Sequence, residues 1–213
     1  MTESSHGIIL RTRLLTETSL IVNWLTPELG RISTVAKGAR RQKSPFRGKL
    51  DLFYEADFSF QRSRRSDLHT LREIVLRETH APLRTNLGYL QQASYCAALI
   101  EQTTEKDTPL PGIFGLLRDF LATLPLRPPQ SRNIFAFELK LLNELGLKPN
   151  LTNTNLTAAS KNLVNELLTE DWLKISELKA TAAQAKELRQ FLHGFLIFHL
   201  GKIPKQRNAA CGS

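Results

Sequence analysis

Basic side chains gather in one short run of this chain, and their types and spacing suit the binding of phosphate groups. The run contains seven cations and no Asp or Glu, and its members are Arg31, Lys37, Arg40, Arg41, Lys43, Arg47 and Lys49. Like charges placed this closely repel one another unless an anionic partner compensates them. Arg is the commoner of the two types, and its planar guanidinium donates paired hydrogen bonds to phosphate oxygens. The alternative interpretation is a solvated loop that only promotes solubility.

Two further basic clusters and one aromatic ring extend this pattern. The second cluster is Arg62, Arg64 and Arg65, and the third is Lys202, Lys205 and Arg207, to which the sequence assigns no role. Phe46 lies inside the first run, and aromatic faces stack on unpaired bases in proteins that bind single strands. We therefore expect nucleic-acid contacts from the first two clusters and from Phe46. Packing in the protein core is the alternative for the Phe46 ring.

The sequence contains few residues whose spacing would suit catalysis or metal binding. None of the five histidines has a Cys or a carboxylate at a spacing typical of a nucleophile–base pair or a metal site. Cys96 and Cys211 are too far apart for a CxxC knuckle. The segment 38–41 lacks the glycine spacing of a phosphate-binding loop. We predict a protein that is not an enzyme and that uses no cofactor or metal. A nuclease is disfavoured because no Asp/Glu cluster suggests a two-metal site.

Length and composition limit the class of protein. The chain has 213 residues, a formal net charge of +9 and 41% hydrophobic residues, which is ordinary globular usage. No apolar stretch approaches the roughly 18 residues of a membrane span, and the N-terminus does not read as a signal peptide. We expect a soluble cytoplasmic protein with no membrane contact and a polyanionic partner.

The first 80 residues show the alternation of β-strands. Predicted strands cover residues 6–13, 19–26, 31–36, 51–61 and 68–79. The fourth is the most regular, with Leu52, Tyr54, Ala56, Phe58 and Phe60 on one face. A turn at 26–30 ends in Gly30, where a positive φ suits glycine. Five short strands in so short a segment favour a small closed or partly open barrel of OB-fold size.

The periodicity becomes helical after residues 80–83. Predicted helices cover residues 84–103, 113–124, 131–146, 158–168, 172–178 and 182–200. Ser131 is the expected N-cap of the third helix and Gly146 its C-cap, and Cys211 is expected in an exposed, frayed tail. The fold class is α+β: a five-stranded OB-fold barrel domain over residues 1–80, followed by an all-α domain over residues 81–213.

Motifs along almost the whole chain are similar to those of one known family. They lie at residues 7–13, 17–22, 25–31, 35–41, 44–50, 137–146 and 199–202. In these segments the chain resembles the RecO family of bacterial recombination mediators. The resemblance implies an N-terminal OB-fold, a helical C-terminal domain, binding of single- and double-stranded DNA, and strand annealing. It also implies RecR, the acidic tail of single-stranded DNA-binding protein (SSB) and, indirectly, RecA as partners, in the RecF pathway at the bacterial nucleoid.

The chain departs from many members of that family in one respect. They carry a four-cysteine zinc knuckle after the central helix, where residues 149–154 of this chain hold no cysteine, so we expect no zinc site. For the acidic SSB tail we expect a groove between the second and third C-terminal-domain helices. Its cations are Arg118, Arg132 and Lys140, and its apolar floor is Phe114, Leu117, Leu121, Phe135 and Leu139. The alternative is that these apolar residues are internal packing.

Two other functions fit the same charge pattern. One is an RNA-binding OB-fold accessory factor, because RNA and DNA backbones are equally anionic. The other is an adaptor whose basic face binds an acidic protein. Competition between DNA and RNA oligonucleotides separates the first from a DNA-binding protein, and negligible oligonucleotide binding at physiological salt would indicate the second.

Overall fold

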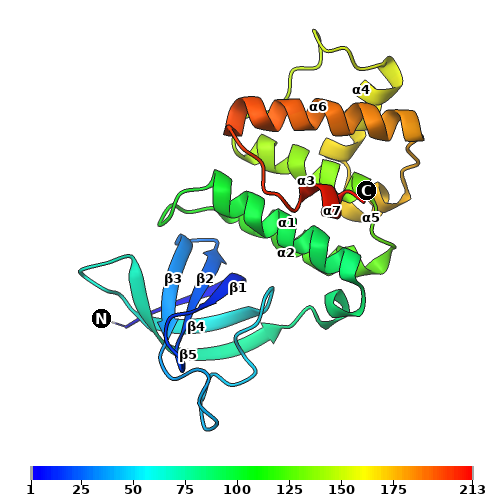
Figure 1. Cartoon of the computed structure of the whole chain (residues 1–213). Coiled ribbons are helices and arrows are strands. Elements are labelled where there is room, and N and C mark those ends of the chain that lie inside the picture. The colour runs from blue at the N-terminus through cyan, green and yellow to red at the C-terminus, as the bar shows by residue number, and fades with distance from the viewer. Residues whose placement is uncertain (1, 213) are drawn as a thin grey trace. The chain divides into compact units, whose positions relative to one another are not determined.

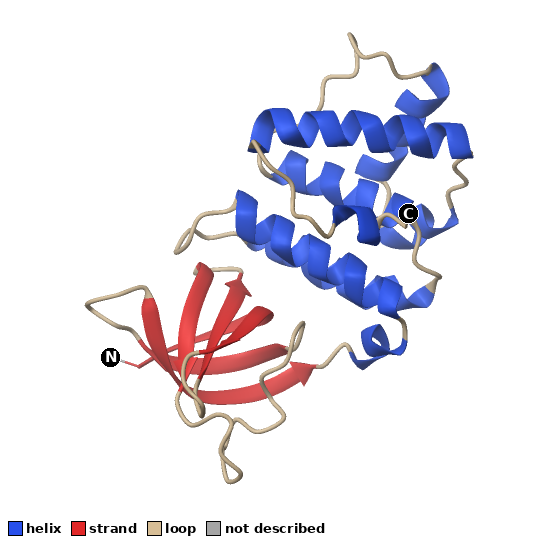
Figure 2. Ribbon diagram, viewed as in Figure 1, coloured by secondary structure: helices blue, strands red, loops and turns tan. Residues whose placement is uncertain are grey.

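The computed structural model describes residues 2–212, and the chain folds into two compact units. The first contains the chain up to Ala81 together with Thr104–Arg118, and the second contains Pro82–Thr103 and the chain from Asp119 onward. All the strands belong to the first unit (Figures 1 and 2). The segment Thr104–Arg118, which follows a predicted helix, is thus part of the barrel unit.

The barrel is closed and has the strand order β1-β2-β3-β5-β4. Its strands are β1 (Thr2–Leu14), β2 (Leu20–Thr26), β3 (Gly30–Ala36), β4 (Glu55–Gln61) and β5 (Leu68–Glu78). The long first strand closes it, because its first half pairs with β4 and its second half with β2. The pairing of β3 with β5 is parallel, and the other pairings are antiparallel. This arrangement confirms the predicted five-stranded OB-fold barrel.

The inward face of β4 begins later than the sequence pattern indicates. Ala56, Phe58 and Phe60 are buried in the barrel core, as predicted. Residues 51–54 form a turn instead of the start of the strand, because Phe53 has a φ of +65°. The turn is held to β1, since the Phe53 N–H donates to the Ile9 carbonyl at 2.8 Å. Phe53 is therefore buried by this contact and not by strand alternation.

The turn between β2 and β3 requires a glycine. Gly30 has a φ of +64°, as predicted for this position. The Thr26 hydroxyl donates to the Gly30 carbonyl at 3.0 Å and accepts from the Leu29 N–H at 3.1 Å. A Cβ at Gly30 would lie 1.8 Å from the Thr108 carbonyl oxygen. The close approach of segment 104–118 to the barrel therefore adds a second requirement for glycine.

The second unit is helical, as predicted, with α2 shared between the two units. Its helices are η1 (Ala81–Thr85), α1 (Leu87–Thr103), α2 (Pro111–Thr123), η2 (Leu124–Leu126), α3 (Ser131–Glu144), α4 (Ala158–Thr169), α5 (Trp172–Glu177), α6 (Ala182–Leu200) and α7 (Arg207–Ala210). The predicted C-cap of α3, Gly146, is one residue too late: Leu145 is the C-cap, and Gly146 follows it with a φ of +74°. The Gly146 N–H donates to the Asn143 carbonyl and the Leu147 N–H to the Leu142 carbonyl, so the glycine still closes the end of the helix. The predicted N-cap is wrong, because Gln130 occupies that position and α3 begins at Ser131.

The end of the chain is packed against the helical unit. Cys211 is only 5% exposed, so the predicted frayed tail is wrong. The Gln92 side chain donates to the Ala210 carbonyl at 2.9 Å, and Arg189 donates to the Cys211 carbonyl at 3.1 Å. These contacts give the backbone carbonyls partners inside the unit, so the tail packs as part of the core.

Candidate nucleic-acid interface

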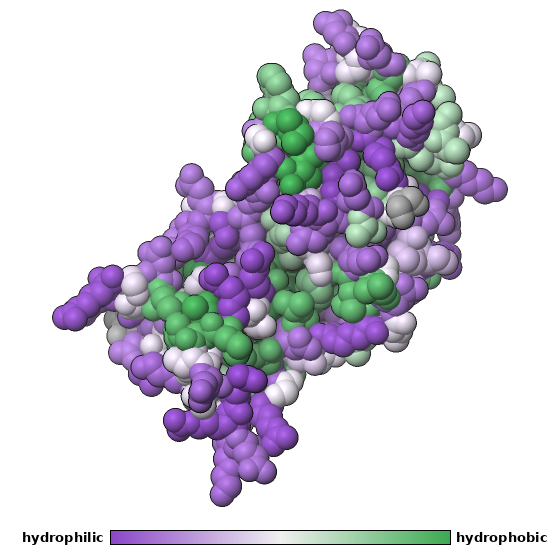
Figure 3. Space-filling model, in the orientation of Figure 1, coloured by the Kyte–Doolittle hydropathy of each residue, from purple (hydrophilic) through white to green (hydrophobic). Residues whose placement is uncertain are grey.

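The segment that follows β3, residues 37–49, forms a compact basic loop. Consecutive tight turns shape it, because the N–H groups of Arg41, Ser44 and Arg47 donate to the carbonyl three residues earlier at 3.0–3.2 Å. The side chains of five of its cations are exposed: Lys37, Arg40, Arg41, Lys43 and Arg47. Hydrophilic side chains accordingly cover this loop at the lower edge of the view in Figure 3. Lys49 is half-buried, with its Nζ 3.5 Å from the Ile74 carbonyl.

Hydrogen bonds fix the basic loop to the turn between β1 and β2. The Arg40 N–H donates to the Thr18 carbonyl and its guanidinium to the Glu17 carbonyl, both at 3.0 Å. The Gly38 N–H donates to the Ser19 hydroxyl at 3.2 Å. Loop and turn therefore hold their positions together before any ligand binds.

Two exposed arginines on β1 add to the cations at this end of the barrel. Arg11 and Arg13 lie at the end of β1 that runs into the turn, and both are exposed. Neither arginine belongs to the basic clusters predicted from the sequence. Their spacing of two residues on a predicted strand was an available signal, because such residues point to the same face of a sheet.

A pocket of about 550 Å³ lies beside the basic loop. Its lining is Leu20, Ala39, Arg40, Gln42, Phe46, Arg47, Gly48, Leu50, Asp51 and Tyr54. Phe46 is 7% exposed and packs in the barrel core, so the expectation that its ring stacks on bases is wrong. The residues on either side of Phe46, Pro45 and Arg47, are exposed. Tyr54 is the half-buried aromatic residue of this lining.

Arg31 is occupied within the barrel unit. Its Nε donates to the Thr104 hydroxyl at 2.7 Å, and a second guanidinium nitrogen donates to the Thr104 carbonyl. It lies at the start of β3, whereas the basic loop follows the end of that strand. The structure therefore separates Arg31 from the other cations of its run.

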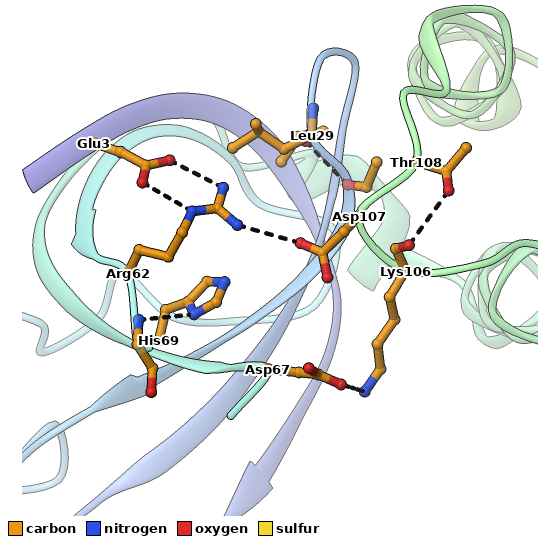
Figure 4. Close-up of polar contacts among 11 residues, drawn as sticks. Glu3, Leu29, Arg62, Asp67, His69, Lys106, Asp107 and Thr108 are labelled. Atoms are coloured by element: carbon orange, nitrogen blue, oxygen red, sulfur yellow. Dashed lines mark hydrogen bonds and ion pairs between the residues drawn. The ribbon is translucent and has the colours of Figure 1, made fainter. Parts of the chain in front are cut away.

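Arg62 is also neutralised by neighbours (Figure 4). Its guanidinium binds both carboxylate oxygens of Glu3, at 2.8 and 3.0 Å, and lies 3.5 Å from Asp107. Hydrogen bonding from Arg62 lowers the pKa of Glu3 below its usual value. The pKa of His69 is lowered by burial and then by the charge of Arg62. The Nδ1 atom of His69 accepts a hydrogen bond from the Ser63 N–H at 3.3 Å. The formal charge of Arg62 is thus balanced inside the barrel unit.

Arg64 and Arg65 are exposed, but they lie away from the basic loop. Their turn follows Gln61, which pairs with Thr2 at the start of β1. The basic loop is bound to the turn that follows Leu14, at the other end of β1. The two clusters from which the sequence predicts nucleic-acid contacts therefore lie near opposite ends of β1.

The third basic cluster contains one buried member. Arg207 is 4% exposed, and its guanidinium binds the two carboxylate oxygens of Glu138 at 2.6 and 2.9 Å. The Tyr95 hydroxyl donates to the same carboxylate at 2.5 Å. Lys202 and Lys205 are the exposed members. Arg207 thus has a structural role in the helical unit.

Two of the three cations predicted to bind an acidic tail donate hydrogen bonds to backbone carbonyls of the helical unit. Lys140 donates to the carbonyls of Leu168 and Glu170, both at 2.8 Å, at the end of α4. Arg132 donates to the carbonyls of Leu178, at 2.7 Å, and Ser176, at the end of α5. Cations at these positions satisfy helix C-terminal carbonyls. Arg118 is exposed.

The predicted apolar floor of that groove is not open. Its five residues are each at most 3% exposed: Phe114, Leu117, Leu121, Phe135 and Leu139. The alternative interpretation, internal packing, is correct for all of them, because side chains this deeply buried present no surface to a peptide.

Between residues 2 and 212 no group of three or more His, Cys, Asp or Glu side chains is placed to hold a metal ion. Over that range no helix has the length and apolar character needed to cross a bilayer.

Comparison with known proteins places the chain in a family. It matches the family described as Recombination protein O N terminal over residues 1–80 and Recombination protein O C terminal over residues 84–160. It is 27% identical to the DNA repair protein RecO of Alkaliphilus metalliredigens, over 93% of this chain and 94% of that protein. It is 34% identical to RecO of Rhodopirellula baltica over 67% of this chain, and 33% identical to RecO of Bacillus pumilus over 69%. These two matches span 53% and 57% of the relatives' lengths. The chain belongs to the RecO family of DNA repair and recombination proteins.

Proposed function

We propose that this chain is a DNA repair mediator without catalytic activity of its own. It binds single- and double-stranded DNA through the basic loop and anneals complementary strands. Together with RecR it helps to load RecA onto strands coated by SSB, in the bacterial cytoplasm. Family membership supports the class of process. The charges of the basic loop support the mode of binding.

The observation that carries the proposal is the set of exposed cations on the basic loop. Lys37, Arg40, Arg41, Lys43 and Arg47 are exposed, and no Asp or Glu lies among them in the sequence. Hydrogen bonds to the neighbouring turn hold the loop in place, so little conformational entropy is lost on binding. Each cation that meets a phosphate releases a condensed counterion, which makes the affinity depend on salt.

A salt series of single-stranded oligonucleotide binding, followed by fluorescence anisotropy, tests the proposal. If the loop neutralises about five phosphates, the logarithm of the binding constant falls against the logarithm of salt with a slope near −3.5, at roughly −0.7 per contact. Replacing Arg40, Arg41, Lys43 and Arg47 together by Ala should bring the slope to about −0.7. An unchanged slope in this variant would exclude the loop as the phosphate-binding element.

Two matched controls remove cations elsewhere. Arg62→Ala removes a guanidinium that Glu3 and Asp107 already neutralise, so the slope should stay near the wild-type value. Lys202→Ala with Lys205→Ala removes two exposed charges from the helical unit. A slope that responds equally to all these changes would indicate diffuse attraction in place of a defined site.

Stronger competition by RNA than by DNA of the same sequence would favour an RNA-binding factor.

The annealing and partner steps need a separate assay. Complementary strands coated with SSB should anneal faster when the wild-type chain is added, and the basic-loop variant should lose this effect with its DNA affinity. For the acidic SSB tail, Arg118→Ala is the informative variant, because Arg118 is exposed whereas Arg132 and Lys140 are half-buried. Unchanged affinity for a labelled acidic peptide would place that contact away from Arg118.

A further inference from the structure

Two leucines are exposed at the end of the barrel that carries the basic loop. Leu14 is 64% exposed and Leu15 is 46% exposed, at the end of β1 and the start of the turn that follows it. Leaving large apolar side chains in water forgoes the free energy of burying them, and exposed apolar side chains grouped together often mark contact sites. The apolar side chains nearer the middle of these strands, among them Ile9 and Leu10 on β1 and Val22 on β2, are buried in contrast.

The leucines are presented by an ordered turn. The N–H groups of Leu15 and Thr16 donate to the Ser19 carbonyl at 3.0 and 3.3 Å. The Ser19 N–H donates in turn to the Thr16 hydroxyl at 3.1 Å. Leu14 is paired with Leu20 on β2. Their exposure is thus a property of a defined turn, and a ligand meets both side chains already in position.

The surroundings of the leucines are cationic. Arg40 donates from its backbone and its guanidinium to Thr18 and Glu17 of the same turn. Arg13 precedes Leu14 on β1 and is exposed, and Glu17 is the one carboxylate between residues 13 and 19. An apolar tip flanked by arginines matches a ligand that carries flat apolar groups on an anionic backbone, as single-stranded DNA does.

We propose that Leu14 and Leu15 form an apolar wedge that inserts between unpaired bases of a strand whose phosphates lie on the basic loop. The wedge rests on the proposed DNA-binding function and adds a base-contacting element to it. Side chains such as Leu, Ile and Phe separate stacked bases in other DNA-binding proteins by the same type of contact.

The pocket beside the loop continues this path. Leu20, the strand partner of Leu14, lines the pocket together with Arg40, Arg47 and Tyr54. A strand that passes over the wedge therefore reaches a site with two cations for phosphates and an aromatic ring for a base.

The test uses a single-stranded oligonucleotide that contains 2-aminopurine, whose fluorescence rises when the base loses its stacked neighbours. The wild-type chain should raise the fluorescence on binding. The double variant Leu14→Ser with Leu15→Ser should abolish the rise and weaken binding about tenfold, because apolar contact area is lost. Its salt slope should equal that of the wild type, since no phosphate contact is removed.

Val75→Ser is the matched control. Val75 is 64% exposed, as Leu14 is, and lies on β5 of the same barrel. This variant should keep both the fluorescence rise and the affinity. Equal melting temperatures of the wild type and both variants show that the barrel remains folded, because all the altered side chains are exposed.

The results separate this proposal from the proposed function. If the wild type binds with the predicted salt slope but the leucine variant keeps the fluorescence rise, the wedge is wrong and the DNA-binding loop stands. If the wild type fails to bind the oligonucleotide, the proposed function is wrong and the wedge with it. If the leucine variant binds DNA normally but loses RecR, the turn is a protein interface and the wedge is overturned.

Discussion

The ion pair between Arg207 and Glu138 leads to a strong prediction about stability. Arg207 is 4% exposed and Glu138 is fully buried, and their side chains form two hydrogen bonds of 2.6 and 2.9 Å. Burial disfavours the charge of Arg207, but the hydrogen bonds and charge of Glu138 outweigh this effect and raise its pKa. Arg207→Met keeps a long apolar side chain and removes the charge. The carboxylate of Glu138 is then left buried without its cation.

The size of the loss follows from that burial. Removing one partner of a buried ion pair destabilises a protein by about 3–5 kcal/mol, because the remaining charge has lost its water and its partner. A domain is stable by roughly 5–15 kcal/mol, so the loss is a large fraction of the total. With a urea dependence of about 2 kcal/mol per molar, the unfolding midpoint should fall by about 2 M.

Urea unfolding followed by the helical circular dichroism signal measures this change, because the helices report on the second unit. Adding Glu138→Gln to Arg207→Met should restore much of the stability, since the buried charge is gone and the new amide oxygen still accepts from the Tyr95 hydroxyl. Lys205→Met is the matched control: Lys205 is exposed in the same segment, so its midpoint should change little.

Two results would refute this reasoning. An unchanged midpoint for Arg207→Met would show that the ion pair contributes no net stability. A double variant no more stable than Arg207→Met alone would show that lost packing, and not an uncompensated carboxylate, causes the effect.

Three further outcomes are expected. Burial lowers the pKa of His69, and the Arg62 charge lowers it further. Below about pH 6.5 the unfolded chain therefore binds a proton at His69 that the folded barrel does not bind. The melting temperature should fall as the pH falls through this range, and it should fall less in His69→Gln. Gly30→Ala should strongly lower the free energy of unfolding measured in urea, because its Cβ would collide with backbone atoms. Gly48 has a φ of +73° and open space around it, so Gly48→Ala should lower the free energy of unfolding by only about 1 kcal/mol. Burial raises the pKa of Cys211 to about 11, so a thiol reagent should label it at neutral pH only as the chain unfolds, and fast labelling of the folded protein would show an open tail.

The sequence by itself determined the elements of both units. Strand alternation and helical spacing are local properties, and they located the strands of the barrel and the long helices close to their observed bounds. Gly30 and Gly146 were also predictable, because a positive φ at a turn or a helix end favours glycine. The pattern failed at residues 51–54, where a backbone contact with Ile9 of β1 overrides the local alternation.

Only the tertiary structure decided which charges are available to a ligand. Arg31, Arg62 and Arg207 all count as basic residues in the sequence. Each is occupied in the structure by a residue far along the chain: Thr104, Glu3 and Glu138 respectively. The basic loop keeps five exposed cations. Spacing along the chain reports local periodicity and charge density. Hydrogen bonds and ion pairs between distant segments form when folding brings those segments together, so no local pattern records them.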